Sequence, residues 1–178
     1  MSVLNLIKRI LGKKGELEIL ESQGFIHGKN FRMHGYVDSN WPWLISVGDN
    51  VCLASDCKIL AHDASTNIVD CHTKIGIVEI GNNVFIGSRA VVLCNTRIGD
   101  NVIVAANSVV NRDLEPNGVY GGVPAKFICS IEEYKSKNQE AIKTHELFNE
   151  IPWDAWMDAS PKKKKEMREK LKDTYGYV

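Results

Sequence analysis

Aliphatic residues recur every six positions through the middle of the chain, and many are followed four places later by a small or β-branched residue. The aliphatic series comprises Val47, Leu53, Ile59, Ile80, Ile86, Val92, Ile98, Val104 and Val110. The second series comprises Val51, Cys57, Val84, Ala90, Thr96, Val102 and Ser108. A six-residue unit suits a short strand and a corner, whereas a step of six would scatter the aliphatics around an α-helix. We therefore predict a mainly β, single-stranded parallel β-helix with three units per coil and both series pointing inward.

Residues suited to tight corners occupy fixed places within each unit. The residue after the aliphatic is often Gly or Ala, and the third after it is often Asn or Asp, as at Asn50, Asp56, Asn83, Asn95, Asn101 and Asn107. Asn, Asp and Gly tolerate left-handed backbone angles, so these positions are predicted corners. An antiparallel barrel is the main alternative, but it would show longer alternating strands joined by hairpin dipeptides.

The period fails once, between Ile59 and Ile80, where the gap is not a multiple of six. The segment at about 62–76, HDASTNIVDCHTKIG, is therefore predicted to leave the wall as a protruding loop, a type of segment that often carries function. Upstream, residues 24–43 contain strand-like fragments without a clean phase, and we interpret them as an irregular first coil. The predicted β-helix domain spans residues 23–130.

Helical patterns flank the repeats. Residues 1–22 form a predicted N-terminal helical segment, whose apolar residues at helical spacing pack on the protein or contact a membrane surface. The predicted C-terminal helices occupy 131–178. A capping box at Ser130 and Glu133 opens the first, with Tyr134, Ala141 and Phe148 on one face. The second begins at Ser160 and Pro161 and continues through Met167, Leu171 and Tyr175.

Two further features of the C-terminal region allow alternative interpretations. The Lys162–Lys165 run is interpreted as a solvated helix face balanced by Glu166 and Glu169, with a polyanion site as the alternative. Trp153 and Trp156, between the helices, are expected to be packing anchors rather than a ligand platform.

Composition narrows the functional classes. Lys and Arg total 22, as do Asp and Glu, so no net charge favours a nucleic-acid partner. The five cysteines show no CxxC pair and indicate reduced thiols in a cytoplasmic protein. No apolar run is long enough for a membrane span, although peripheral contact stays open.

Residues 44–131 resemble the hexapeptide-repeat acyltransferases, especially the maltose and galactoside O-acetyltransferases and the polysaccharide O-acetyltransferases. The resemblance rests on VGDNVCLASDCKILAHDAS and on the repeats from Val78, which close with GGVPAKFI. It implies a left-handed β-helix, a homotrimer, and acetyl-CoA bound in grooves between neighbouring subunits, with no metal required. The acceptor it implies is a sugar hydroxyl on a polysaccharide or nucleotide-sugar precursor.

The resemblance also implies a catalytic base. A histidine at the beginning of the protruding loop has this role in the family, and the matching residue is His62. A hydroxyl is a poor nucleophile until an imidazole removes its proton, which makes this residue type chemically apt. His72, in the same loop, is the competing base, and with Asp63 it is a candidate substrate-binding residue. Asp63 could instead orient His62, and that role stays open.

Two other histidines and a set of cofactor positions complete the candidates. His27 and His34 lie in the first coil and are expected to be structural, with an acceptor-binding wall as the alternative. For coenzyme A, the resemblance carries over Phe85, Ser88, Ala106, Asn111, Arg112 and Lys126. Phe85 stands where the family has Trp, Asn111 where it has Thr, and Cys129 where a basic residue is expected.

Two other functional classes remain possible. The γ-class carbonic anhydrases use the same β-helix with zinc bound by three histidines, but they place two of them five residues apart, a spacing that no histidine pair shows here. A non-catalytic trimeric scaffold is the second. Coenzyme A binding would argue against it.

Overall fold

The computed structural model describes residues 15–178, which divide into two compact units. The first reaches Ile131 and contains the stacked walls of parallel strands, and the second runs from Glu132 to Val178. Within the described residues no helix is long and apolar enough to cross a bilayer. Residues 1–14 of the predicted N-terminal helical segment lie outside the described residues.

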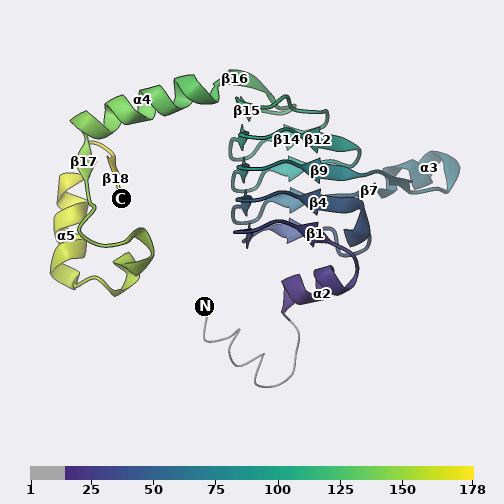
Figure 1. Ribbon diagram of the computed structural model, residues 1–178, viewed down its shortest axis with the longest axis horizontal. Helices are drawn as coiled ribbons and strands as arrows, with labels where there is room; N and C mark the ends of the chain where they lie inside the picture. Colours follow the sequence, from purple (N-terminus) through teal and green to yellow (C-terminus); the bar gives the residue numbers. More distant parts are fainter. Residues whose placement is uncertain (1–14) are drawn as a thin grey trace. The chain divides into compact units, whose positions relative to one another are not determined.

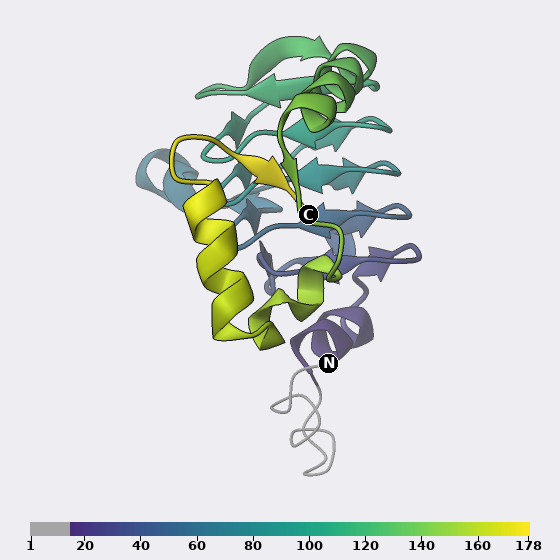
Figure 2. The ribbon, with the colours of Figure 1, turned by 90° about the vertical axis from the view of Figure 1, so that its left-hand side faces the viewer.

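Three parallel sheets form the walls of the first unit, which is a parallel β-helix as predicted (Figures 1 and 2). Wall A contains β1 (Ile26–His27), β4 (Ile45–Val47), β9 (Val78–Ile80) and β12 (Thr96–Ile98). Wall B contains β2 (Arg32–Met33), β5 (Cys52–Leu53), β10 (Phe85–Ile86), β13 (Ile103–Val104), β15 (Gly118–Gly121) and the antiparallel β16 (Lys126–Ser130). Wall C contains β3 (Tyr36–Val37), β6 (Lys58–Ile59), β11 (Val91–Val92) and β14 (Val109–Val110). The chain visits the walls in the order A, B, C, so each coil stacks in register on the last.

The interior is filled by the two predicted series. All nine aliphatics of the six-residue period are buried, and so are the seven residues four places later, Ser108 and Thr96 included. Large and small side chains therefore share the narrow core of each coil, as the sequence predicts. Burial in this core raises the pKa of the Cys57 thiol to about 12, because the thiolate would be desolvated there.

Asparagines form a ladder along one corner of the β-helix. Asn30, Asn50, Asn83, Asn101 and Asn117 all have φ between 55° and 62°. Each of the first four donates its side-chain amide N–H to the next along the series, over 2.9–3.1 Å. All six predicted corner residues adopt positive φ, so the corner prediction is confirmed.

A protruding arm leaves the corner between walls C and A. It consists of β7 (His62–Asp63), η2 (Ala64–Thr66), α3 (Asn67–Asp70) and β8 (Lys74–Ile75), with β7 and β8 paired antiparallel. Figure 1 shows it projecting from the stacked coils. The insertion explains the broken period, because Asp49 and Asn82 are stacked although 33 residues apart, whereas Asn82 and Asp100 are stacked 18 apart.

The first coil is a coil with irregular spacing, as predicted. β1, β2 and β3 pair in parallel with β4, β5 and β6. The six-residue phase is lost because Met33 and Val37, the partners of Leu53 and Ile59, are only four residues apart. In addition, the corner after β3 is expanded by the 3-10 helix η1 (Pro42–Leu44). Below this coil, α2 (Glu16–Ser22) buries Leu20 against the core.

The second unit differs from the predicted pair of helices. It contains α4 (Ile131–Thr144, which begins just before the unit), β17 (Glu146–Leu147), η3 (Trp153–Asp158), α5 (Pro161–Lys170) and β18 (Gly176–Tyr177). The assignment of Phe148 to the first helix is wrong, because α4 ends at Thr144 and β17 pairs with β18 instead. Tyr175 likewise lies beyond α5, where it stacks on His145 with ring centroids 4.1 Å apart.

The expected caps and anchors are partly present in this unit. The Ser160 hydroxyl accepts a hydrogen bond from the N–H of Lys163, and Pro161 occupies the first turn of α5, as predicted. Trp156 packs edge-on against the buried Phe148. Trp153 is 66% exposed, so its assignment as a packing anchor is wrong.

Candidate active site

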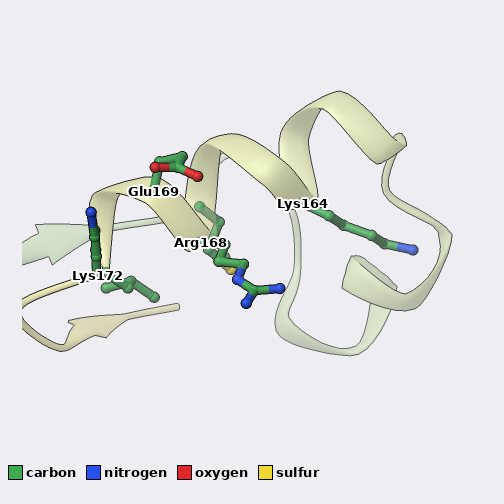
Figure 3. Close-up of a pocket in the computed structure, with 6 residues that line it drawn as sticks. Lys164, Arg168, Glu169 and Lys172 are labelled. Atoms are coloured by element: carbon green, nitrogen blue, oxygen red, sulfur yellow. The ribbon is translucent and has the colours of Figure 1, made fainter.

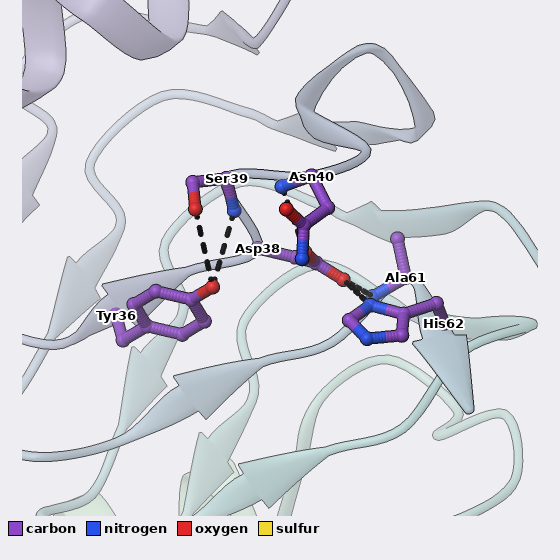
Figure 4. Close-up of polar contacts among 6 residues, drawn as sticks. All are labelled: Tyr36, Asp38, Ser39, Asn40, Ala61 and His62. Carbon is purple, nitrogen blue, oxygen red and sulfur yellow. Dashed lines mark hydrogen bonds and ion pairs between the residues drawn. The ribbon is translucent and has the colours of Figure 1, made fainter. Parts of the chain in front are cut away.

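His62 is paired with an aspartate from the coil below. Its Nδ1 hydrogen-bonds the Oδ2 atom of Asp38, a residue that is fully buried (Figure 4). The His62 side chain is 26% exposed, so part of the ring still reaches solvent. With Nδ1 engaged by the carboxylate, Nε2 is the ring nitrogen left to act on a substrate.

Three further hydrogen bonds hold this pair in place. The Asp38 carboxylate accepts the N–H of Ala61 at 3.0 Å and that of Asn40 at 3.1 Å. The Ala61 carbonyl accepts the N–H of Gly76 at 2.9 Å, which closes the base of the arm. A Cβ on Gly76 would lie 2.7 Å from the backbone nitrogen of Asn95, so only glycine fits there. The backbone before His62 is thus fixed from both sides.

Asp38 was absent from the sequence-based candidates. The sequence offers one signal, which is that Asp38 directly follows a β-branched residue in the first coil. To infer from this signal that Asp38 lies beside His62, the register of β3 against β6 must be known. That register was hidden by the lost phase of residues 24–43.

Asp63 and His72 face other partners. The Asp63 carboxylate accepts the N–H of Ser65 at 2.9 Å and caps η2. Hydrogen bonding from Ser65 also lowers the pKa of Asp63 below its ordinary value. His72 lies on the arm, exposed, with Nδ1 hydrogen-bonded to the carbonyl of Asp70. None of these hydrogen bonds joins Asp63 or His72 to His62.

The two histidines of the first coil have partners other than His62 and Asp38. His27 hydrogen-bonds the Gly28 carbonyl and the Glu21 carboxylate, each at 2.8 Å, and stacks on Phe31. Burial lowers the pKa of His27, but these hydrogen bonds and the Glu21 charge outweigh it, so the pKa is raised overall. His34 is exposed at the end of β2, where its N–H donates to the Leu53 carbonyl.

The six candidate coenzyme positions lie on the outer surface of walls B and C. Ser88 and Ala106 occupy the corner between these walls on neighbouring coils, as shown by the hydrogen bond from Asn107 N–H to the Ser88 carbonyl. Phe85 points outward from β10, and Lys126 begins β16. All six residues are exposed.

Asn111 and Arg112 share a corner with His62. His62 follows β6 of wall C, and Asn111 follows β14, which lies two strands further along the same wall. Neighbouring strands are spaced about 4.8 Å apart, so these positions are separated by roughly 10 Å along the stack. The corner therefore carries both the histidine and a cation.

Metal-binding geometry is lacking in this region. Within residues 15–178 no group of three or more His, Cys, Asp or Glu side chains could hold a metal ion.

Known proteins are similar to this chain in sequence and in fold. A family model described as bacterial transferase hexapeptide (six repeats) matches residues 77–112. Galactoside O-acetyltransferase of Escherichia coli (strain K12) is 30% identical over 139 residues, which cover 72% of this chain and 68% of that protein. The putative lipopolysaccharide biosynthesis O-acetyl transferase WbbJ of the same strain is 34% identical over 111 residues, covering 56% of this chain and 57% of that protein.

A solved structure is also similar to this chain. A hexapeptide-repeat acetyltransferase from Vibrio cholerae, complexed with acetyl coenzyme A, superimposes with a TM-score of 0.52 at 28% identity, covering 59% of this chain and 60% of that one. The chain thus spans between 57% and 68% of the length of these relatives. On the repeat, the walls and these similarities, the chain belongs to the hexapeptide-repeat acyltransferase family, with its left-handed parallel β-helix.

Proposed function

We propose that this protein transfers the acetyl group of acetyl-CoA to a sugar hydroxyl, with His62 as general base and Asp38 as the residue that positions it. The observation that carries the proposal is the contact between His62 Nδ1 and the buried Asp38 carboxylate. A buried carboxylate that accepts the Nδ1 proton holds the imidazole in the tautomer whose Nε2 is a free acceptor.

The reaction follows from this tautomer. His62 Nε2 takes the proton of the acceptor hydroxyl while its oxygen attacks the thioester carbonyl, giving a tetrahedral oxyanion. The oxyanion then collapses, the carbon–sulfur bond breaks, and the protonated imidazole returns its proton to the thiolate. The products are the acetyl ester and free coenzyme A, and the histidine is restored.

The donor site is proposed at the surface that carries the six candidate positions. Arg112 and Lys126 supply cations for phosphate groups, and the small Ala106 lets the coenzyme approach the backbone. Phe85 is 43% exposed on β10 and offers an apolar surface for the pantetheine arm. The relative from Vibrio cholerae was solved with acetyl coenzyme A, which supports this donor.

A homotrimer is proposed to complete the site. The tip of the arm exposes two large apolar side chains, Ile68 at 90% and Val69 at 83%, and such a patch suits contact with a second copy. Light scattering of the purified protein tests the assembly.

A cytoplasmic location is also proposed, because the five free cysteines are consistent with a reducing compartment.

The acceptor is proposed to be a polysaccharide or nucleotide-sugar precursor. This rests on the relatives, which include a galactoside enzyme and a putative lipopolysaccharide biosynthesis enzyme. His72 and Asp63, on the arm near His62 in sequence, are proposed to contact the acceptor. A mass-spectrometric screen of glycans incubated with acetyl-CoA identifies the class.

A thiol-release assay with the acceptor from that screen tests the catalytic assignment. We expect His62→Ala to lower kcat by about 100-fold or more, since general-base catalysis contributes roughly that amount. His72→Ala is the comparison for a loop histidine: because His72 is proposed to contact the acceptor and not to remove its proton, this variant is expected to raise the KM for the acceptor and to retain most of kcat. Turnover unchanged in His62→Ala contradicts the assignment, and absence of coenzyme A binding by calorimetry would favour a non-catalytic scaffold.

A further inference from the structure

Helix α5 presents a cationic surface that the proposed reaction does not use. It carries six basic and two acidic residues, and Lys162–Lys165 are consecutive and exposed. Glu166 offsets only part of this charge, through a 3.9 Å ion pair with Lys162. The second unit as a whole has balanced charge, so the excess is confined to this helix and its C-terminal end.

The cations border a hollow that charged and apolar side chains line together. Lys164 and Arg168 are four residues apart and therefore lie on one side of α5, and Lys172, in the turn after the helix, lines the same hollow. Figure 3 shows the side chains that line the hollow, among them these three cations and Glu169. Met167 and Leu171 also line it. Long basic side chains over apolar groups can contact an apolar layer while their charged ends reach polar groups.

Exposed apolar side chains adjoin this surface. The Lys164 ammonium donates to the carbonyl of Met157 at 2.5 Å, which joins the beginning of α5 to the end of η3. Met157 is 84% exposed and Trp153, in the same short helix, is 66% exposed. Trp156 is turned the other way, against Phe148.

We propose that this α5–η3 surface, comprising Trp153, Met157, Lys162–Lys165, Arg168 and Lys172, binds the surface of an anionic lipid bilayer. Clusters of lysine and arginine are attracted to anionic headgroups, and Trp partitions into the interface between headgroups and acyl chains. A soluble polyanion would match the cations but would leave Trp153 and Met157 in water. The inference is independent of the proposed acetyl transfer.

Vesicle sedimentation of the full-length protein tests the proposal. The probes are vesicles of phosphatidylcholine alone and vesicles in which a third of the lipid is phosphatidylglycerol. We expect wild-type protein to pellet with the anionic vesicles and to be released by high salt, because exposed charges are screened. The Lys162→Glu/Lys163→Glu/Lys165→Glu variant is expected to bind at least tenfold more weakly. Lys164 is retained because of its contact with Met157.

The matched control reverses three charges on another helix of the same unit. Lys135→Glu/Lys137→Glu/Lys143→Glu in α4 is expected to bind like wild type, and circular dichroism checks that both variants fold. Trp153 supplies an independent readout, since its fluorescence is expected to shift to the blue with anionic vesicles. Trp153→Phe should abolish that shift.

Three outcomes overturn the proposal. One is equal binding by the α5 and α4 variants. Another is loss of binding in Lys8→Glu/Arg9→Glu while the α5 variant binds fully, which would assign the contact to the N-terminal segment. The last is retention on heparin with no binding to anionic vesicles, which would assign the surface to a soluble polyanion.

Discussion

The Asp38 carboxylate links two successive coils, because it contacts His62 Nδ1 although the residues are 24 apart in sequence. It is fully buried and also accepts the N–H of Ala61. A buried carboxylate needs such partners, since an unpaired charge there would be strongly destabilising. The same contacts that satisfy Asp38 therefore orient the proposed base.

Replacing Asp38 by Asn is expected to lower kcat by about 100-fold while the KM for acetyl-CoA changes little, because the amide can reverse the tautomer of His62 without touching the donor. Steady-state kinetics over a range of pH measure both constants. Asp63→Asn is the comparison: Asp63 caps η2 and is proposed to contact the acceptor, so this variant is expected to affect the KM for the acceptor while kcat stays near the wild-type value. A folded Asp38→Asn enzyme with wild-type kcat would remove Asp38 from the mechanism.

The asparagine ladder makes a prediction about stability. Asn83 has φ of 55° and hydrogen-bonds Asn50 and Asn101 through its side chain. Asn83→Ala should cost roughly 2–3 kcal/mol, from left-handed strain of about 1–2 kcal/mol and the lost hydrogen bonds. Asn83→Gly loses the same bonds without the strain and should cost less. Urea unfolding of both variants measures the difference, and equal losses would show that the backbone conformation is unimportant.

His27 predicts a pH dependence of stability. Its pKa is raised above 6.5 in the folded chain, so its contribution is fully present below pH 6.5 and is lost as the pH rises through the raised value. Because Glu21 is 45% exposed, the effect should be below about 1 kcal/mol. Unfolding of His27→Gln at several pH values should show a smaller loss towards alkaline pH than wild type. His34→Gln should behave as wild type does; the same reduction in that variant would refute the role of His27.

The cysteines should differ in reactivity. Cys57 is fully buried and its pKa is raised to about 12, whereas Cys71 is exposed on the arm. Thiolate is the reactive form, so a thiol reagent at pH 8 should modify Cys71 within minutes and leave Cys57 intact until the protein unfolds. Peptide mapping after brief labelling checks this, with Cys71→Ser as control. Early modification of Cys57 would indicate that the second coil opens.

Much of the β-helix could be predicted because its information is local. Each six-residue unit supplies its own inward aliphatic and its own corner residue, so Ile86 and Asn83 can be assigned without knowing what they touch. The insertion was equally visible, since a strict period makes its interruption stand out. His62 came from the family resemblance at this interruption, and the structure places it where the arm begins.

The errors arose where tertiary packing overrides local preference. Phe148 fits the helical period of α4, yet it is buried beyond the end of that helix because β17 pairs with β18, some 30 residues later in the chain. Trp153 and Trp156 lie in the same connecting segment, and the sequence gives no reason to treat them differently. Only Trp156 packs against a buried residue, Phe148, whereas Trp153 is exposed.

The sequence by itself determined the coil, its interior and the position of the arm, because a short repeat encodes strand, corner and core within each unit. Only the tertiary structure decided what faces His62. Asp38 reaches it across two stacked coils, and that contact depends on the register of β3 against β6, which no local pattern specifies. Adjacent Asp63, the obvious partner in sequence, points to Ser65 because successive residues of an extended strand face opposite sides.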